Sequence, residues 1–220
     1  IGYWIIESGT PHDFDNVDTT VLEVIKENIV SVLKTVVHQK TLETIVRKDL
    51  FTGLYSEEYL YGEGKKVIDQ YTISTMCMFK ITNIQEINNR YSRELGNKVI
   101  TEISEVVKEN ISDDYIFVRY MGPKFVIALS GVDTNSVGSF LNALKEKIEN
   151  MKISLTEEEV AKFSLDVKFK NANVASQVAR PVLNFAISSY YKGTGLEEVL
   201  KKLEEYLDNA PEDESDITNI

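Results

Sequence analysis

The chain has 220 residues and a mass of 25.0 kDa, enough to bury one sizeable hydrophobic core or two small ones. Hydrophobic residues make up 43% and charged residues 27% of the chain, a composition typical of globular rather than disordered proteins. The formal net charge of -11 repels phosphate backbones and argues against binding to nucleic acid. The single cysteine excludes an internal disulfide, and no apolar run approaches the ~20 residues that cross a bilayer. We therefore expect a cytoplasmic location and no membrane span in this fragment.

The first 17 residues predict the end of a preceding domain. The chain opens with the apolar stretch IGYWII and has no initiating methionine, as expected of a piece of a longer protein. Residues 3–6 are aromatic or β-branched and predict a strand. Residues 7–18 contain a glycine, a proline and several aspartates and predict a loop.

Residues 18–48 contain neither glycine nor proline and predict one long helix, with Asp18, Thr19 or Thr20 as its cap. Apolar residues alternate along it at spacings of three and four, which is typical of the seam of a two-stranded coiled coil. The members of this seam are Leu22, Ile25, Ile29, Val32 and Val36. The alternative is a long amphipathic helix that packs on its own domain. Because the helix is longer than a globular domain usually needs, we favour a homodimer formed through this seam.

The seam does not continue unchanged to the end of the predicted helix. It fades over residues 38–41 and resumes out of phase at Leu42, Ile45 and Val46. A phase break of this kind locally changes the winding of a coiled coil.

From residue 49 on, helical and strand patterns alternate. The predicted strands cover residues 74–81, 115–120, 124–130, 163–169 and 182–189. The predicted helices cover residues 94–111, 135–151 and 196–207. The first strand is mostly apolar, so we expect it at the centre of a sheet, and Met121, Gly122 and Pro123 predict a tight hairpin.

These elements predict an α/β fold, an α+β sandwich in which helices flank a central, mainly antiparallel sheet, over residues 49–210. Residues 211–220 are acidic and polar, and they predict a flexible tail.

Three motifs stand in one order along this domain: DLFTGLY at residues 49–55, FKITNIQEINNRY at 79–91 with Gly96-Asn97 after it, and RYMGPKF at 119–125. They resemble the D-x-L-T-G-L-x opening, the D-x-D-x-F-K-x-x-N-D-x-Y … G-D segment and the R-Y-G-G-D/E-E-F hairpin of GGDEF domains, the diguanylate cyclase family. The resemblance implies a nucleotide-cyclase-like palm over residues 49–210, preceded by a signalling helix. Residues 1–17 resemble the C-terminal end of a GAF-type sensor domain.

The family condenses two GTP molecules into cyclic di-GMP by two-metal phosphoryl transfer, in which carboxylates hold the metal ions. The positions that match the family's carboxylates are Lys80, Thr82, Pro123 and Lys124 in this chain. Because a lysine ammonium has no lone pair to offer Mg²⁺, the departure implies a degenerate site with no metal, no cofactor and no catalytic residue.

The other site positions follow the family to different degrees. Asn88 matches the asparagine that contacts guanine, Asn97 replaces an aspartate, and Met121 replaces a glycine. Gly122 and Phe125 are retained. The family's inhibitory R-x-x-D motif falls on residues 112–115, which contain no arginine, and the stretch we match to its phosphate-binding cations, residues 209–215, is acidic here.

We therefore predict a catalytically inactive GGDEF-like signal-transduction module of a bacterial-type sensory protein. It is expected to act by dimerisation and by binding a protein partner or a nucleotide. Three alternatives stay open: a metal-independent receptor for GTP or cyclic di-GMP, an active diguanylate cyclase, and a plain structural spacer. In the receptor, Lys80, Asn88 and Lys124 bind an anion. The family hairpin places the two lysines side by side, so either an anion or nearby carboxylates must neutralise them.

Overall fold

The computed structural model describes residues 5, 7–16, 18–166, 178–211 and 216–220. The chain divides into two compact units, Ile1–Thr44 and Ile45–Ile220. The strand predicted at residues 3–6 lies outside the described residues except for Ile5, which belongs to no strand. None of the described helices combines the length and the apolar character that a membrane span requires.

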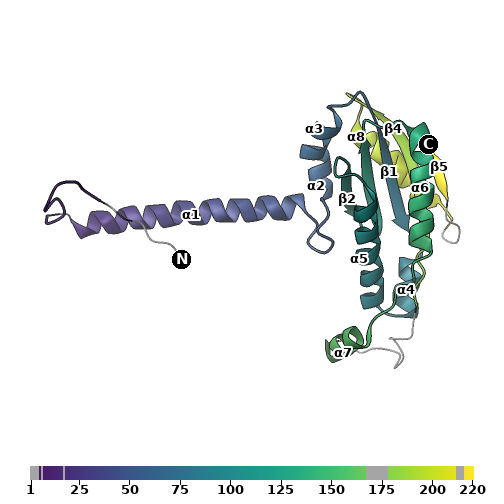
Figure 1. Ribbon diagram of the computed structural model, residues 1–220, viewed down its shortest axis with the longest axis horizontal. Helices are drawn as coiled ribbons and strands as arrows, with labels where there is room; N and C mark the ends of the chain where they lie inside the picture. Colours follow the sequence, from purple (N-terminus) through teal and green to yellow (C-terminus); the bar gives the residue numbers. More distant parts are fainter. Residues whose placement is uncertain (1–4, 6, 17, 167–177, 212–215) are drawn as a thin grey trace. The chain divides into compact units, whose positions relative to one another are not determined.

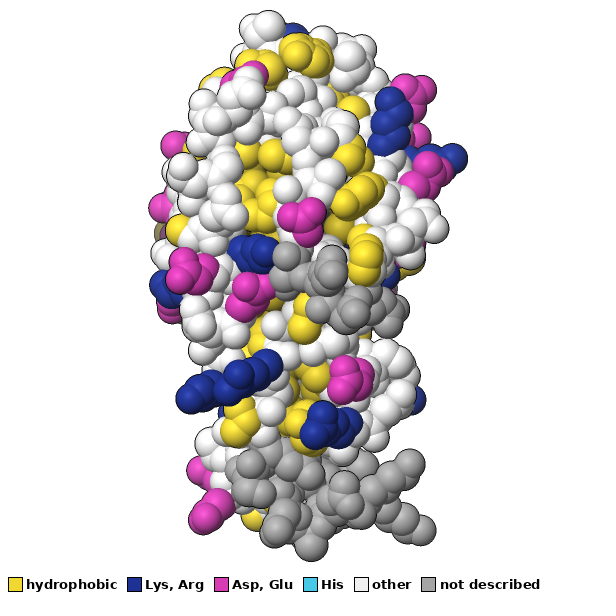
Figure 2. All heavy atoms as spheres, turned by 90° about the vertical axis from the view of Figure 1, so that its right-hand side faces the viewer, with side chains coloured by type: hydrophobic (Ala, Val, Ile, Leu, Met, Phe, Trp, Pro, Cys, Tyr) yellow, Lys and Arg dark blue, Asp and Glu magenta, His cyan; other side chains and the backbone are white. Residues whose placement is uncertain are grey.

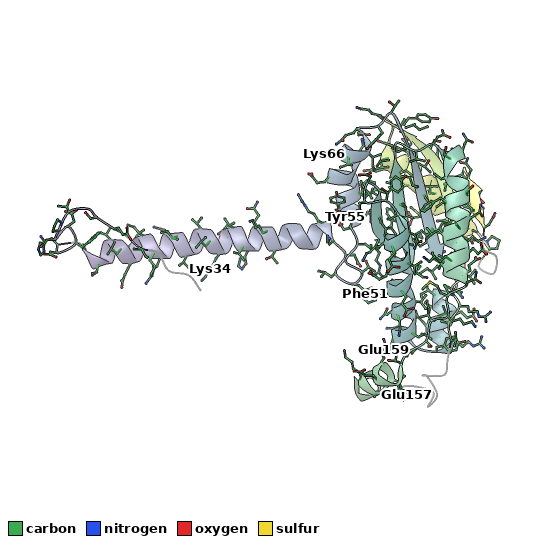
Figure 3. All side chains as sticks on the ribbon, in the orientation of Figure 1. Lys34, Phe51, Tyr55, Lys66, Glu157 and Glu159 are labelled. Carbon is green, nitrogen blue, oxygen red and sulfur yellow. The ribbon has the colours of Figure 1, made fainter. Side chains whose placement is uncertain are left out.

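Helix α1 (Thr19–Arg47) makes up most of the first unit. Its start confirms the predicted cap, because the backbone N–H of Thr20 donates to Asp18 Oδ1 at 2.9 Å. Side chains stand out along the helix (Figure 3), and four members of the seam are 40–62% exposed, with Leu22 half-buried. The exposed four are Ile25, Ile29, Val32 and Val36. The side chains of Leu42, Ile45 and Val46 lie outside the described part of the chain.

A five-stranded sheet forms the centre of the second unit (Figure 1), in the order β2-β3-β1-β4-β5. The strands are β1 (Ile73–Ile81), β2 (Ile116–Met121), β3 (Lys124–Ser130), β4 (Leu183–Tyr191) and β5 (Ile217–Asn219). Neighbouring strands are antiparallel except β4 and β5, which are parallel. The mainly antiparallel sheet, with the strand predicted at residues 74–81 in its centre, is confirmed.

Helices cover both faces of this sheet. One face packs against α5 (Arg93–Asn110) and α6 (Thr134–Glu149), with α4 (Ile84–Arg90) beside α5. The other face packs against α8 (Leu196–Asn209) and a helical segment built from α2 (Glu57–Tyr59), a π-helical turn (Leu60–Gly64) and α3 (Lys65–Ile68). On the side that bears α6 and β5, basic and acidic side chains are interspersed (Figure 2).

Alternate residues of β1 serve two separate cores, because successive side chains of a strand point to opposite faces. Cys77 and Phe79 pack in the core with α5 and α6, and Met76 and Met78 pack in the core with α8. By the same alternation, Lys80 lies on the α8 face.

The strand predicted at residues 163–169 is wrong over residues 163–166, which belong to helix α7 (Glu157–Asp166). Residues 167–169 lie outside the described part. A capping box starts α7: the backbone N–H of Thr156 donates to Glu159 Oε2 at 2.7 Å, and the backbone N–H of Glu159 donates to Thr156 Oγ1 at 3.2 Å. This helix-starting signal prevails over the alternating pattern.

The predicted flexible tail is wrong over residues 217–219, which form β5 along β4. The side chain of Asn184 on β4 is buried and forms hydrogen bonds to Pro211 and to Asp216, which directly precedes β5. Asn184 Nδ2 donates to the carbonyl of Pro211 at 2.8 Å, and the backbone N–H of Asp216 donates to Asn184 Oδ1 at 3.0 Å. A single buried amide therefore satisfies backbone groups on both sides of the connection.

The DLFTGLY segment forms a loop tied to β2 through Asp49. Asp49 Oδ1 accepts hydrogen bonds from the backbone N–H and the hydroxyl of Thr52, at 2.7 and 2.6 Å, and lies 3.2 Å from Arg119 Nη1. Gly53 turns the chain with φ of +67°, which glycine adopts without strain. Burial alone would raise the pKa of Asp49, but the Thr52 hydrogen bonds and the Arg119 charge outweigh it and lower the pKa.

We predict that Asp49→Asn lowers the free energy of unfolding at pH 7 by about 1–2 kcal/mol, because Thr52 and Arg119 lose a charged acceptor. Since the folded-state pKa of Asp49 is depressed, its contribution is present above the ordinary value of 3.8 and is lost as the pH falls through the folded-state value. Urea denaturation at several pH values measures this difference. Glu63→Gln, at an exposed pair with Lys66, is the control. A difference that does not shrink on acidification would contradict the assignment.

Candidate functional site

Two lysines meet where β1 ends and β3 begins. Lys80 is the penultimate residue of β1, Lys124 is the first residue of β3, and the two are direct partners in the antiparallel register. Both point to the α8 face of the sheet by strand alternation. The predicted juxtaposition of these two side chains is confirmed.

Helix α8 brings two carboxylates to the lysines. Its apolar stripe of Leu200, Leu203 and Leu207 is fully buried on the sheet, and Glu204 and Asp208 follow one turn apart beside that stripe. Lys124 Nζ donates to Glu204 Oε1 and to Asp208 Oδ2, each at 2.7 Å. Lys80 Nζ donates to Asp208 Oδ1 at 3.2 Å. Asp208 thus bridges the two lysines, and we call these four residues the lysine–carboxylate network.

The network lies at the edge of the core, where solvent weakens ion pairs less than it does on the open surface. The side chain of Lys124 is only 11% exposed and that of Lys80 is 18% exposed. Burial would lower the pKa of Lys124, but its hydrogen bonds to Asp208 and Glu204 outweigh burial and raise it. Likewise, burial would raise the pKa of Asp208, and the two lysines lower it instead. Both shifts favour the charged forms.

The predicted site residues around the turn have mostly structural contacts. Thr82 is buried, and its hydroxyl donates to the carbonyl of Val182 at 3.2 Å. The carbonyl of Pro123 accepts from the backbone N–H of Ile81 at 3.1 Å. Gly122 occupies the turn with φ of +56°, which explains why a glycine is retained there.

The side chains of Met121 and Phe125, on either side of the turn, differ in burial. Met121 is exposed, whereas Phe125 is fully buried and stacks on Phe79 with ring centroids 4.9 Å apart. Phe125 is therefore a core residue and does not line the site.

Asn88 and Asn97 lie on the helices of the opposite face and are not joined to the lysine–carboxylate network by any hydrogen bond or ion pair within the described part of the chain. Asn97 is exposed on α5. Asn88 is half-buried on α4, and its amide packs so closely on Gly96 that a Cβ there would lie 1.9 Å from Asn88 Oδ1. Only glycine fits at position 96 beside this amide. Asn88 therefore has a packing role.

Comparison with known families gives the identity of the fold. The family described as "Diguanylate cyclase, GGDEF domain" matches residues 46–177, more than half of the chain. The chain therefore belongs to the GGDEF family.

Individual relatives are distant. The chain is 20% identical to the probable diguanylate cyclase DgcT of Escherichia coli over 114 residues, which are 51% of this chain and 25% of that protein. It spans a quarter or less of the length of the first curated relatives that it matches.

Two solved structures share the fold at low identity. One is the coiled coil and GGDEF domain of DgcB from Caulobacter crescentus in complex with c-di-GMP, with a TM-score of 0.70, 11% identity, and coverage of 90% of this chain and 99% of that one. The other is diguanylate cyclase SiaD in complex with its activator SiaC from Pseudomonas aeruginosa, with a TM-score of 0.63, 12% identity, and coverage of 90% and 74%.

The side chains at this site do not fit the two metal ions that the family's chemistry uses. The strand ends carry two ammonium groups, which cannot ligate a metal ion, and Glu204 and Asp208 both accept hydrogen bonds from them. Among the described residues, no three His, Cys, Asp or Glu side chains are grouped so that they could hold a metal ion.

Sequence reasoning missed Glu204 and Asp208, because it matched the family's phosphate-binding cations to residues 209–215. Helix α8 extends to Asn209, and the site-facing carboxylates Glu204 and Asp208 lie five residues and one residue before position 209. Two acidic residues four apart, beside the leucine stripe of the last described helix, were the available signal.

The anion-binding site of the receptor alternative is not supported by this geometry. Each lysine already has a carboxylate partner, and an incoming anion has to displace Asp208 or Glu204 and meet their negative charge. Burial, together with the charges of Glu58 and Glu204, also raises the pKa of neighbouring Glu57, which reflects the density of carboxylates around this site.

We predict that Lys124→Met lowers the free energy of unfolding by about 2–3 kcal/mol at pH 7, because it leaves Glu204 and Asp208 facing each other without their shared cation. Adding Glu204→Gln to this variant should cost less than the sum of the two single changes. Denaturant unfolding measures all three. Lys201→Met, at the exposed pair with Glu205, is the control and should leave the midpoint unchanged. A Lys124 variant as stable as the Lys201 variant would contradict the network.

Proposed function

We propose that this chain is a catalytically inactive GGDEF module that transmits a signal by dimerising and by contacting a protein partner. In this proposal residues 18–48 are the signalling helix, residues 1–17 end a GAF-type sensor, and the whole belongs to a cytoplasmic sensory protein. The observation that carries the proposal is the lysine–carboxylate network, whose two lysines occupy positions that we match to the family's metal-binding carboxylates.

The charges around this site are the reverse of what metal-dependent phosphoryl transfer requires. Two cations stand at the positions that we match to the family's metal-binding carboxylates, and α8 adds two carboxylates beside them. A triphosphate with its metal ions would meet lysines in place of metal ligands and the carboxylates of α8 beside them. The same four residues therefore disfavour binding of the metal ions and of the triphosphate.

Dimerisation is supported by the exposed seam of α1. Ile25, Ile29 and Val36 are each about 40% exposed on a helix that carries apolar residues at heptad spacing. Contact with a protein partner is supported by the fold it shares with SiaD, which binds an activator protein. Inactivity as an enzyme leaves both kinds of contact unaffected.

We predict that the protein forms no cyclic di-GMP from GTP with Mg²⁺ or Mn²⁺, because Glu204 and Asp208 are already engaged by the two lysines. Chromatographic detection of the product, with a GGDEF domain that keeps all four family carboxylates as positive control, measures this. Product above the no-enzyme blank that disappears in the Lys124→Met variant would overturn the proposal.

We also predict a homodimer at tens of micromolar that Ile29→Asp converts to a monomer, because a carboxylate in the seam would be buried without a partner. Sedimentation equilibrium on the full chain measures the mass. Val24→Asp is the matched control: Val24 is on the same helix, outside the seam, and 53% exposed, so this variant should stay dimeric. A wild-type monomer, or equal effects of the two substitutions, would refute the seam.

A further inference from the structure

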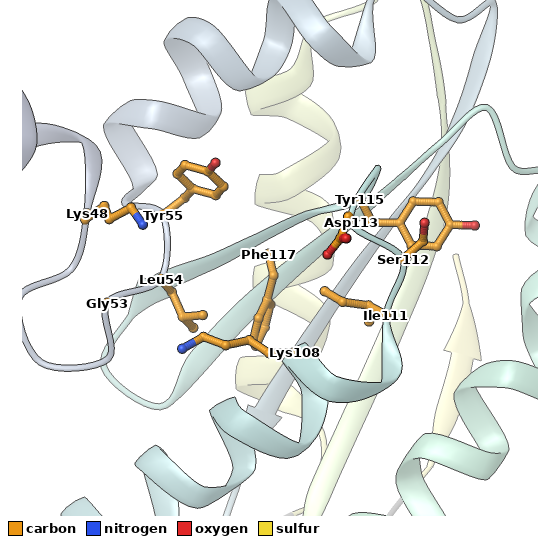
Figure 4. Close-up of a pocket in the computed structure, with 10 residues that line it drawn as sticks. All are labelled: Lys48, Gly53, Leu54, Tyr55, Lys108, Ile111, Ser112, Asp113, Tyr115 and Phe117. Carbon is orange, nitrogen blue, oxygen red and sulfur yellow. The ribbon is translucent and has the colours of Figure 1, made fainter.

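The two edges of the five-stranded sheet differ in how they are covered. At β2, the DLFTGLY loop lies beside the outer edge (Figure 4). The backbone N–H of Tyr55 donates to the carbonyl of Phe117 at 3.3 Å, and the backbone N–H of Arg119 donates to the carbonyl of Tyr55 at 3.0 Å. At β5, no strand or isolated bridge pairs with the outer edge within the described part of the chain. The open edge of this sheet is therefore β5.

The backbone of β5 presents hydrogen-bonding groups to this open edge. The carbonyl of Asp216 and the backbone N–H of Ile220 bond to β4, at 2.8 and 2.9 Å. Because the backbone groups of successive residues in a strand point in alternate directions, those of Ile217 and Asn219 point away from β4. The N–H of Ile217 donates to Asp216 Oδ1 at 2.7 Å. Among the described residues, this leaves both carbonyls and the N–H of Asn219 for an added strand.

A cavity of about 570 Å³ adjoins the end of β5, and most of its wall is apolar. It lies between the flank of α8 that carries Tyr206, the connection through Pro211, and Ile220. The hydroxyl oxygens of Tyr206 and Thr218 lie 2.7 Å apart, which joins this flank of α8 to β5. Every second side chain of a strand added to β5 would point to the α8 face. An apolar side chain on that face can therefore occupy the cavity.

The part of the chain that forms this edge is acidic. Residues 201–220 include seven acidic residues and two lysines. Asp216, which directly precedes β5, is exposed. A second copy of the chain would bring the same excess of negative charge to the edge, which disfavours pairing between two β5 strands. A strand that carries lysine or arginine side chains is attracted instead.

We propose that the edge of β5 binds an extended basic segment of a partner protein as an additional strand. Main-chain hydrogen bonds to Ile217 and Asn219 hold the segment, and an apolar side chain enters the cavity beside Ile220. Lysine or arginine side chains neutralise the acidic residues around the edge. This binding is one form of the partner contact in the proposed function and rests on it. It does not depend on inactivity, because no residue of the lysine–carboxylate network lines the cavity.

The test is fluorescence anisotropy of the labelled peptide Lys-Val-Arg-Ile-Lys-Val-Arg-Ile, titrated with the full chain. We expect saturable binding with a dissociation constant below about 1 mM, which weakens as salt is added. The control peptide Lys-Lys-Arg-Arg-Val-Val-Ile-Ile keeps the charge and composition without the alternation, and it should bind at least about tenfold more weakly. In ¹H–¹⁵N NMR spectra of the wild type, the alternating peptide should shift residues 216–220 and Tyr206 most.

Asn219→Pro is the matched variant, because proline removes the N–H that points to the open edge and is tolerated in edge strands. It should weaken binding of the alternating peptide about tenfold. Asn219→Ala keeps the N–H and should bind like the wild type. Matching thermal midpoints of the two variants exclude unfolding as the cause.

The proposal is overturned if the alternating peptide does not bind saturably at about 1 mM or below, or if the two peptides bind equally. Equal affinities of the Asn219→Pro and Asn219→Ala variants would also overturn it. Pairing with a second copy would overturn it as well: the Ile29→Asp protein would then stay dimeric in sedimentation equilibrium and become monomeric when Asn219→Pro is added. Failure of this binding leaves the cyclase assay unaffected, and cyclic di-GMP formation would refute inactivity without changing the result expected at β5.

Discussion

The interaction on which this site depends is the sharing of one carboxylate by two lysines. Asp208 accepts from Lys80 with one oxygen and from Lys124 with the other, while Glu204 supplies a second partner to Lys124. These contacts join the ends of two central strands to the last described helix. They therefore add to the apolar packing of α8 on the sheet and decide which charges remain at the strand ends.

The four charged residues are stable at this site only as a set. A lysine at either strand end alone would be a poorly solvated cation, and a carboxylate on α8 alone would be a partly buried anion. Together they neutralise one another, and burial is offset by short hydrogen bonds. The four charges therefore attract the strand ends to α8.

Most of the domain could be predicted from the sequence, because its signals are local. The apolar strand at residues 74–81 is central, the hairpin turns at Gly122, and the motif register places Lys80 beside Lys124. The strand and the hairpin depend on periodicity or on residues near one another in the chain, and the place of the two lysines depends on the resemblance to the family's motifs.

The features that sequence reasoning missed depend on long-range contacts or on competing local signals. Asp208 lies 128 positions after Lys80, and nothing near either residue indicates that they meet. The same holds for β5, which depends on the buried amide of Asn184 on another strand. At α7 a capping box at Thr156 and Glu159 competed with an alternating pattern and prevailed.

The central claim is that the lysine–carboxylate network leaves no divalent-metal site at the strand ends. Paramagnetic broadening of backbone amide signals during titration with Mn²⁺ tests it most directly, since an ion bound there would lie next to residues 80–82 and 122–125. Our account predicts that these signals broaden no more than those of other surface residues of this acidic chain. Selective broadening of the two segments at low Mn²⁺ concentration would contradict it.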